Sequence, residues 1–467
     1  MAITVYTNNQ YYSDIADAIR NQNGTNNTYA PAKMAEAINK LSQKGWQRPV
    51  DFPDYSKLDI SDEEVLYLTY AVRANYGFIC IKFRGATTID IGTLNNGVYT
   101  VLSTENVADN TVYTKLLDNY QMDYIVVRVR PNGGHITSFN TTNLGHQIIN
   151  GLKYYPPYQS MVEAYGRLPF LTTLLNSFRN AGNLKSVTLI DMNSVNSFER
   201  ILNDSREIEN VDIAGVPTTA ECTLYYAFGN CPKLKHLHLH GAGTKGSAQN
   251  AFQGCFLLED TDIESLNYIN TGNLANAFQY CYNLKSLNLS GWNVSNATNI
   301  SNIFYGVNCE INISTWTISG NISNAFYNTR ISKIPTASYG ELSNIGSFLR
   351  GSTIEGVVDL SAFTFASTVT TLGAYVISGT RATSIIIPAN ITKIDPHSMR
   401  DNQFLREFHI LATTPPTLSQ TNALTTNNTC LQYIYVPYSA DHSILQTYQN
   451  ATNWSTLTQY LVEEPND

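Results

Sequence analysis

The chain has 467 residues, a formal net charge of −8 at pH 7, and charged side chains at only 14% of its positions. Ordinary globular chains carry roughly 25% charged residues, so the polarity of this chain comes instead from Asn, Ser, Thr and 30 Tyr. The negative balance argues against binding to nucleic acid, which favours a basic surface. No apolar run approaches the roughly 20 residues of a membrane-spanning helix, so we expect no membrane insertion.

Residues 1–45 are predicted to form an anchor module of two short helices. Ile15 and Ile19 share one face of the first helix, and Met34 and Ile38 share one face of the second. Helices of about ten residues bury too little surface to be stable alone, so we expect this pair to dock on a larger assembly. The chain starts without a basic and apolar leader, so we expect no secretory signal.

The anchor module carries a recognisable phrase. Ile15-Ala-Asp-Ala-Ile-Arg20 is followed by Gly24-Thr25 and then by Tyr29-x-Pro31-x-x-Met34. This phrase resembles a small module of tail and virion proteins from phages that infect Gram-positive bacteria. The resemblance implies a protein that is assembled in the host cytoplasm, is located in the virion, and contacts other virion proteins through this module.

Residues 46–150 are predicted to form a β-sandwich domain. Runs rich in β-branched and aromatic residues occur at 65–70, 78–83, 97–102 and 124–129, and a Pro-Asn-Gly-Gly turn follows at 131–134. Short strands separated by such turns are typical of a small antiparallel sandwich.

Residues 151–467 are predicted to form a solenoid with a C-terminal cap. A marker Phe recurs at intervals of 22 to 26 residues, and an apolar residue usually follows it six positions later, before a strand. The recurring residues are Phe228, Phe252, Phe278, Phe304, Phe326 and Phe348. This period lies in the range of about 20–29 residues typical of leucine-rich repeats, in which stacked units share one core.

A cysteine stands three positions after the marker Phe in three units, as Cys231, Cys255 and Cys281. A metal site or a disulfide framework is one interpretation, but the cysteine count of 7 is odd and no Cys-x-x-Cys pair occurs. Cys also packs well as a small apolar residue. We therefore expect a buried column of thiols and no cofactor.

The phrase Asn276-Ala-Phe278-Gln-Tyr-Cys281-Tyr-Asn-Leu284-Lys-Ser-Leu287 resembles the BspA-like, or treponemal, type of leucine-rich repeat. The resemblance implies a solenoid with a parallel β-sheet, so the fold class is mixed but β-rich. For the C-terminal cap of the solenoid, we expect a helix that has Ser439 as its N-cap residue and ends near Gln449, with Trp454 nearby.

No Walker, His-Glu-x-x-His, Gly-x-Ser-x-Gly or Gly-x-Gly-x-x-Gly motif occurs, so we expect no enzyme. Alignment of the repeats places a polar row on the outward face of the predicted sheet, with His238 between Asp212 and Asp262. The predicted row contains Asp212, His236, His238, Asp260, Asp262 and Asn288. It is a candidate receptor contact or divalent-metal site, or a polar face that only solvates the sheet. A glycan-hydrolase site is the weakest alternative, because no motif marks the carboxylates as an acid and base.

The main prediction is a structural component of a phage particle. Its repeat arm would bind a host-surface glycan or protein, as part of a tail or baseplate fibre. A capsid decoration or head fibre protein is one alternative, and a bacterial cell-surface adhesin is another. Association of several copies into a homo-oligomer is left open.

Overall fold

The structure is a computed structural model that describes residues 52–72, 77–120, 122–141, 144, 147–149, 152–155, 159–270, 273–294 and 297–466. The predicted anchor residues Ile15, Ile19, Met34 and Ile38 lie outside these residues. The chain forms two compact units. The N-terminal unit contains the described residues up to 246, with 250–268 and 281–284, and the C-terminal unit contains 247–249, 269–280 and 285–466.

The N-terminal unit begins with a β-rich block in which antiparallel strands form two larger sheets and a short hairpin. All four predicted strand runs form strands here. The elements are η1 (Tyr55–Lys57), β1 (Val65–Ala71), β2 (Phe78–Arg84), β3 (Thr87–Asn95), β4 (Val98–Val107), β5 (Val112–Leu116), β6 (Tyr124–Pro131), β7 (Ser138–Asn140), β8 (Gln147–Ile149) and β9 (Leu152–Tyr154). Strands β1, β6, β3 and β4 are neighbours in one sheet, and β5, β2 and β7 form the other.

Strand β3 was not predicted, because its sequence contains Asp90, a residue type depleted in strands. The Asp90 carboxylate is buried and accepts hydrogen bonds from Arg128 and Arg130, each at 2.8 Å, and from Thr104 at 2.7 Å. Buried charge is tolerated when it is paired in this way, so the cross-strand partners make the strand possible.

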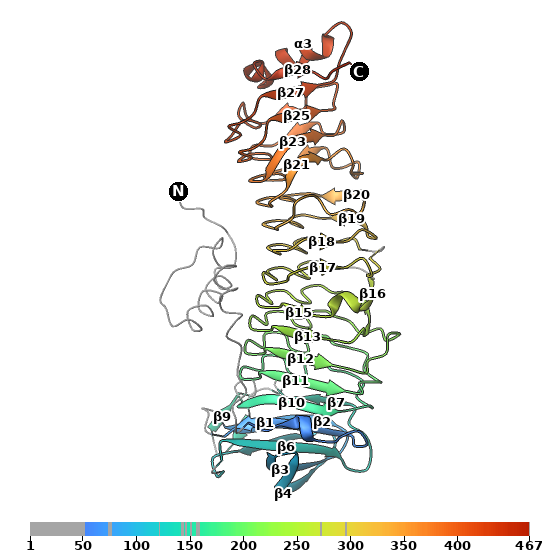
Figure 1. Cartoon of the computed structure of the whole chain (residues 1–467), viewed down its shortest axis with the longest axis vertical. Coiled ribbons are helices and arrows are strands. Elements are labelled where there is room, and N and C mark those ends of the chain that lie inside the picture. Colours follow the sequence, from blue (N-terminus) through green and yellow to red (C-terminus); the bar gives the residue numbers. More distant parts are fainter. Residues whose placement is uncertain are drawn as a thin grey trace. The chain divides into compact units, whose positions relative to one another are not determined.

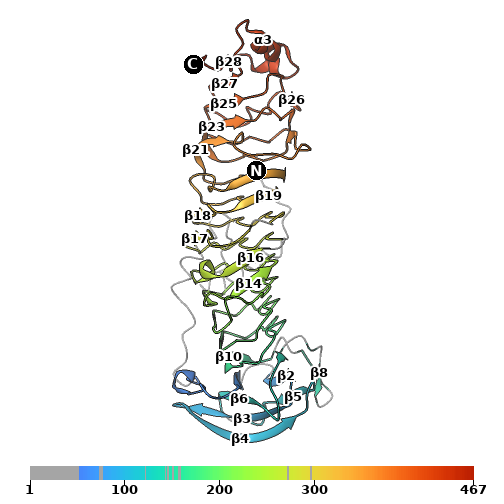
Figure 2. The ribbon, with the colours of Figure 1, turned by 90° about the vertical axis from the view of Figure 1, so that its right-hand side faces the viewer.

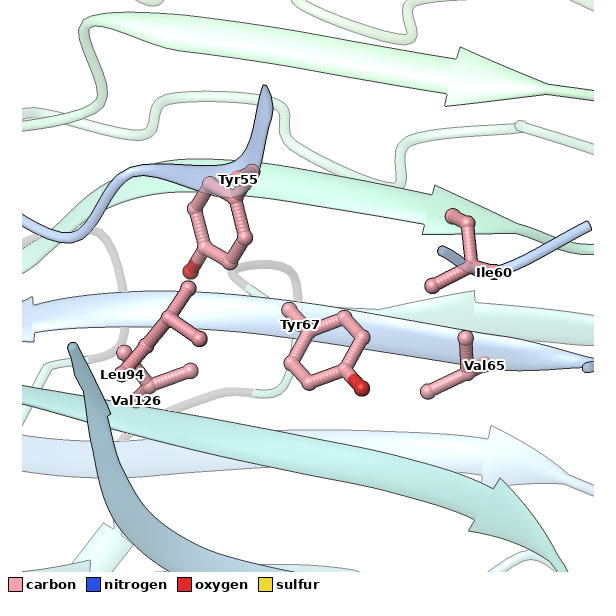
Figure 3. Close-up of a cluster of buried hydrophobic side chains, with 6 residues drawn as sticks. All are labelled: Tyr55, Ile60, Val65, Tyr67, Leu94 and Val126. Atoms are coloured by element: carbon pink, nitrogen blue, oxygen red, sulfur yellow. The ribbon is translucent and has the colours of Figure 1, made fainter. Parts of the chain in front are cut away.

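Strand β1 is the centre of this block, because side chains on both of its faces are buried. Val65 and Tyr67 pack in one cluster with Tyr55 and Ile60, which come from the segment just before the strand (Figure 3). On the opposite face, the Tyr70 hydroxyl donates to Gln159 at 3.1 Å. The β-rich block thus has a core on either side of this sheet.

The same sheet continues directly into the repeats. β10 pairs antiparallel with β1 and parallel with β11, and the later repeat strands follow in parallel (Figure 1). These strands are β10 (Met161–Arg167), β11 (Ser186–Ile190), β12 (Asn210–Ile213), β13 (His236–His238) and β15 (Asp260–Thr261). The nine-stranded order is β15-β13-β12-β11-β10-β1-β6-β3-β4. The antiparallel strands therefore cover the first edge of the parallel sheet, which would otherwise expose unpaired backbone groups.

The N-terminal unit also contains β14 (Gly243–Gly246) and η3 (Ile263–Ser265), and the boundary between the units falls within β16 (Asn267–Asn270). The C-terminal unit continues the repeat pattern with shorter strands. These are β17 (Leu287–Asn288), β18 (Ile311–Asn312), β19 (Thr317–Asn321), β20 (Ser338–Asn344), β21 (Glu355–Asp359), β22 (Thr371–Leu372), β23 (Arg381–Ile387), β24 (Lys393–Ile394), β25 (Glu407–Ile410), β26 (Thr417–Leu418), β27 (Tyr433–Val436) and β28 (Leu461–Glu463). The described strands of this unit pair with one another in parallel, which confirms the predicted solenoid of stacked parallel coils.

Each coil has a tight turn around the marker position, and left-handed residues define it. In the coil of Phe326, Asn324 has φ 54° and Asn328 has φ 52°. The same spacing of four residues occurs at Asn176 and Asn180, at Asn302 and Gly306, and in further coils of both units. Asn and Gly adopt this conformation at the lowest cost, so the repeated Asn is a turn signal that the search for apolar periodicity missed.

The interior of the coils matches the predicted register except in the coil of Phe348, where the left-handed Ser347 places Leu349 at the position that Phe326 has in its own coil. The marker Phe residues and the apolar residues six positions later are buried, and Phe228 stacks on Phe252 with ring centroids 5.8 Å apart. The predicted thiol column is present and has a further role, because each thiol donates to a carbonyl of the preceding coil. Cys231 donates to Leu202 at 3.2 Å, Cys255 to Phe228 at 3.1 Å, and Cys281 to Phe252 at 3.1 Å. Burial raises the pKa of Cys255 to about 12, which keeps its thiol protonated and able to donate.

The C-terminal unit ends in the helix α3 (Ser443–Asn450) and the short helix η4 (Trp454–Leu457), beyond its last coils (Figure 2). The predicted N-cap, Ser439, stands three residues before the observed N-cap, His442. The Ser439 hydroxyl accepts a hydrogen bond from the Ile444 amide at 3.1 Å, but Asp441 accepts one from Ser443, and the helix begins there. Trp454 is buried and donates its indole N–H to the Pro416 carbonyl at 2.7 Å, which fixes the cap on the last coils.

Candidate binding surface on the parallel sheet

The predicted polar row lies on the outward face of the parallel sheet in the N-terminal unit. Asp212 pairs with His238 across β12 and β13, and His236 pairs with Asp260 across β13 and β15, in the predicted register. Between them along β13, Leu237 points inward and is fully buried. The alternation of apolar and polar residues therefore places the imidazoles and carboxylates on one solvent-accessible face.

Two imidazoles share one carboxylate. His236 Nδ1 lies 3.0 Å from Asp260 Oδ2, and His238 Nε2 lies 3.3 Å from the same oxygen. The hydrogen bond from His236 is the main cause that holds the pKa of Asp260 below its usual range. The Asp260 side chain is 58% exposed, so this charge is available to an external ligand.

The expected position of Asp262 is not observed. Its carboxylate accepts hydrogen bonds from the backbone amides of Leu239 at 2.8 Å and His240 at 2.6 Å, in the preceding coil. Strand β15 ends at Thr261, so the outward alternation has stopped before Asp262. Asp262 ties two coils together and does not flank His238.

His240 is a member of the row that the sequence interpretation did not include. Its Nε2 lies 2.7 Å from Asp212 Oδ1, and its side chain is 49% exposed. The signal was the continued alternation of His236, His238 and His240, but the predicted strand ended at Leu239. His240 has φ 51°, so the backbone turns out of the strand at this residue. Its side chain nevertheless reaches the Asp212 carboxylate, which the repeat alignment had placed beside His238.

Asn288, the last predicted member, belongs to the C-terminal unit. There β17 pairs with β18, and the Asn288 side chain accepts a hydrogen bond from the Ser290 hydroxyl at 2.8 Å. The outward row of the N-terminal unit therefore consists of Asp212, His236, His238, His240 and Asp260, hereafter called the Asp/His row. It offers exposed hydrogen-bond donors and acceptors.

Metal coordination finds no support in the geometry of the Asp/His row. Among the residues that the structure describes, no group of three or more His, Cys, Asp or Glu side chains could hold a metal ion. The row divides into one carboxylate with two imidazoles and one carboxylate with one imidazole. Its chemistry is that of a polar contact surface, which can donate to and accept from a ligand rich in hydroxyl or amide groups.

Comparison with known proteins identifies the repeat type. The model for the BspA type leucine rich repeat region matches residues 174–285 and 322–454, in six copies, and so covers more than half of the chain. A model described as a Mycoplasma protein of unknown function, DUF285, matches residues 246–339. A search of curated proteins gave no match. No helix in the described parts of the chain is long and apolar enough to cross a membrane.

Two solved structures are similar to the chain. One is a leucine rich cell surface protein from Faecalibacterium prausnitzii A2-165, with 15% identity and a TM-score of 0.26, covering 72% of this chain and 93% of that chain. The other is a leucine-rich repeat protein from Bacteroides ovatus ATCC 8483, with 13% identity and a TM-score of 0.29, covering 71% of this chain and 95% of that chain. Neither of them is described as a virion protein.

Proposed function

This chain belongs to the BspA type of leucine-rich repeat proteins, and we propose that it is a binding protein of the adhesin kind. Its repeats would present the outward face of the parallel sheet to a glycan or protein on a cell surface. The observation that carries this proposal is the Asp/His row of the N-terminal unit. The three imidazoles and two carboxylates are between 31% and 58% exposed and pair with one another across three coils.

The Asp/His row is not required to hold the coils together. The buried alternate residues, such as Leu237, form the core, and Asp262 links the coils through the backbone. Exposed ion pairs contribute little to folding, typically about 0–1 kcal/mol. A row of this composition is therefore better explained by contact with a ligand than by stability.

The test is binding of the fluorescently labelled full chain to bacterial cells, measured with a panel of strains. Asp212→Asn combined with His238→Ala should weaken binding by about tenfold or more, because charge-assisted hydrogen bonds would be lost. The melting temperature should stay close to that of the parent. Glu221→Gln is the matched control, because Glu221 is an exposed, ion-paired carboxylate of the same unit that lies outside the row.

Equal loss of binding in the control and in the double variant would point to a general charge effect. Unchanged binding of the double variant would remove the Asp/His row from the contact surface. We also propose that the chain has no catalytic activity. Release of sugar from cell walls by the parent chain, and its loss in the double variant, would contradict that.

A tail or baseplate fibre remains a prediction that depends on the N-terminal phrase. That phrase, at residues 15–38, lies outside the described residues, and the capsid decoration and head fibre alternatives depend on it equally. Mass spectrometry of purified virions would detect the chain if it is a particle component. Deletion of residues 1–42 should then prevent incorporation and leave the repeats folded.

A further inference from the structure

One edge of the C-terminal unit carries a row of aromatic and basic side chains, with one contribution from each successive coil. Tyr280 contacts Tyr305 with ring centroids 5.0 Å apart, and Tyr305 contacts Tyr327 at 4.4 Å. The guanidinium carbon of Arg350 then lies 5.3 Å from the centre of the Tyr327 ring and 4.0 Å from that of Tyr375. The tyrosine–arginine stack, defined here as Tyr327, Arg350 and Tyr375, is the half-buried part of this row.

The backbone places the two rings in the coils on either side of the coil of Arg350. The Asn328 amide donates to the Arg350 carbonyl at 2.8 Å, so the coil of Tyr327 precedes that of Arg350. The Gly351 amide donates to the Ser378 carbonyl at 2.6 Å, so the coil of Tyr375 follows it. A planar cation between two rings can receive a partner only at its N–H edge.

Among the residues that the structure describes, Arg350 differs from the other tyrosine-stacked arginines because no carboxylate pairs with it. Arg128 stacks on Tyr99 and pairs with Asp90, and Arg200 stacks on Tyr225 and pairs with Glu199. In the part of the chain that the structure describes, no Asp or Glu forms an ion pair with Arg350. The pre-oriented N–H edge of Arg350 therefore lacks the carboxylate that its counterparts have.

The backbone at Tyr375 gives a second, independent reason to assign a role to the stack. Tyr375 has φ 63° at the first left-handed position of its turn, where Asn324 and Asn302 stand in earlier coils. A non-glycine residue pays roughly 1–2 kcal/mol for this conformation, and Asn pays less than most. A tyrosine at this position is unfavourable for the turn, so we attribute its presence to the contact of its ring with Arg350.

We propose that the tyrosine–arginine stack binds a carboxylate of an acidic polysaccharide, such as one that contains uronic acids. The arginine fork matches a carboxylate through two parallel hydrogen bonds. Tyr327 and Tyr375 are only half-buried, so the accessible part of each ring can contact a sugar. The row repeats once per coil, which suits a linear chain of sugars lying along the coils of this unit.

A densely charged polyanion fits the stack less well. The chain has a net charge of −8, which repels polymers with a charge on every unit. Beyond Tyr375, whose ring stacks on His397, Arg400 contacts His397 and is already paired with Asp401 at 2.7 Å, so it offers a ligand less free charge than Arg350. A glycan with widely spaced carboxylates is therefore favoured over polyphosphate or nucleic acid.

This inference rests on the proposed binding role but not on the Asp/His row. The test is calorimetric titration of the full chain with a hyaluronan hexamer, in which neutral sugars alternate with uronic acids, and with its methyl ester, which keeps the sugar rings and removes the charges. The parent should bind the hexamer and not the ester. Arg350→Lys should weaken binding by about tenfold or more, because lysine keeps the charge but not the planar fork.

Two variants control for folding and for general charge. Tyr375→Asn should weaken binding while the fold is kept, because Asn suits the left-handed position. Arg200→Lys changes a stacked but already paired arginine and should leave binding unchanged. The inference is overturned if the parent ignores the hexamer, if the ester binds equally, if polyphosphate competes, or if Arg200→Lys matches Arg350→Lys. If the chain adheres to cells but does not bind the hexamer, the proposed carboxylate site is wrong and the proposed binding role stands.

Discussion

The two units use different side chains at the same place in the coil. In the N-terminal unit, Cys231 and Cys255 each donate one thiol hydrogen bond to a carbonyl of the coil before. In the C-terminal unit, Asn402 and Asn428 take this role, with amide donors to Ile377 at 2.9 Å and to Met399 at 2.8 Å. A buried side-chain donor therefore recurs at this position in both units with different residue types, although Ala181 and Val307 stand there in other coils.

The difference matters for energetics, because an amide can also accept. Asn402 Oδ1 accepts from the Thr380 amide at 2.9 Å and from its hydroxyl at 2.7 Å, and Asn428 Oδ1 accepts from the Asn402 amide at 2.9 Å. Each of these amide side chains both donates to and accepts from the preceding coil, whereas the thiols only donate. We expect the amide column to contribute more stability per residue.

The largest expected effect is at Asn402. Asn402→Ala should lower the free energy of unfolding by about 3–5 kcal/mol, because several buried groups would lose their partners at once and each costs about 1–3 kcal/mol. Urea unfolding of the full chain measures this. The control is Asn390→Ala, because Asn390 is exposed and donates one hydrogen bond to Val369 at 3.1 Å. Similar losses for the two variants would refute a special role of the amide column.

Substitution of a thiol should have a smaller effect. Cys255→Ala should cost about 1–2 kcal/mol, from one weak hydrogen bond and a small cavity. Cys255→Ser should cost less, because Ser205 already stands at this position in an earlier coil and donates to Phe178 at 2.7 Å. If Cys255→Ala destabilised the chain as much as Asn402→Ala, the two columns would be equivalent and the comparison would be wrong.

The column also shows what the sequence could reveal. The repeat was visible where the donor is Cys, because the Phe-x-x-Cys phrase recurs unchanged. In the coil of Phe326 the phrase changes, because Thr329 stands three positions after Phe326 and donates within its own coil, to the Phe326 carbonyl. A pattern of residue types cannot identify a position that is defined by a shared hydrogen bond.

The outward face had similar limits. The Cα register of Asp212 with His238 was predictable, because alternation fixes which residues face outward. The side-chain pairs could not be predicted, because the Asp262 carboxylate binds the Leu239 amide and His240, not His238, pairs with Asp212. The tyrosine–arginine stack was missed because Tyr327, Arg350 and Tyr375 stand at different offsets from the marker positions in their coils.

The left-handed turns are the feature that both units share, and they should respond equally. Asn176→Ala in the N-terminal unit and Asn324→Ala in the C-terminal unit should each cost about 1 kcal/mol, because Ala is disfavoured at the φ values of 55° and 54° found there. Asn→Gly at the same positions should lie within about 0.5 kcal/mol of the parent, because glycine adopts this conformation freely. Thermal melts of the four variants measure this. A large difference between the units would show that the turns, and not only the interior columns, distinguish them.

The smallest expected effect is on the outward face, at Asp260. The hydrogen bond from His236 lowers the pKa of Asp260 in the folded chain, so the stabilisation from its charged form is present above the ordinary carboxyl range. It is lost as the pH falls through the lowered folded value. Because the carboxylate is largely exposed, Asp260→Asn should cost no more than about 0.5 kcal/mol near neutral pH.

Urea unfolding at about pH 6 and about pH 3 tests the sign, because the cost of Asp260→Asn should shrink toward acid pH. A cost that grew toward acid pH would mean that the charged carboxylate destabilises the fold. A cost near that of Cys255→Ala would mean that the Asp/His row supports the coils. The row would then have a structural explanation of its own, and the argument that it is kept for ligand contact would fail.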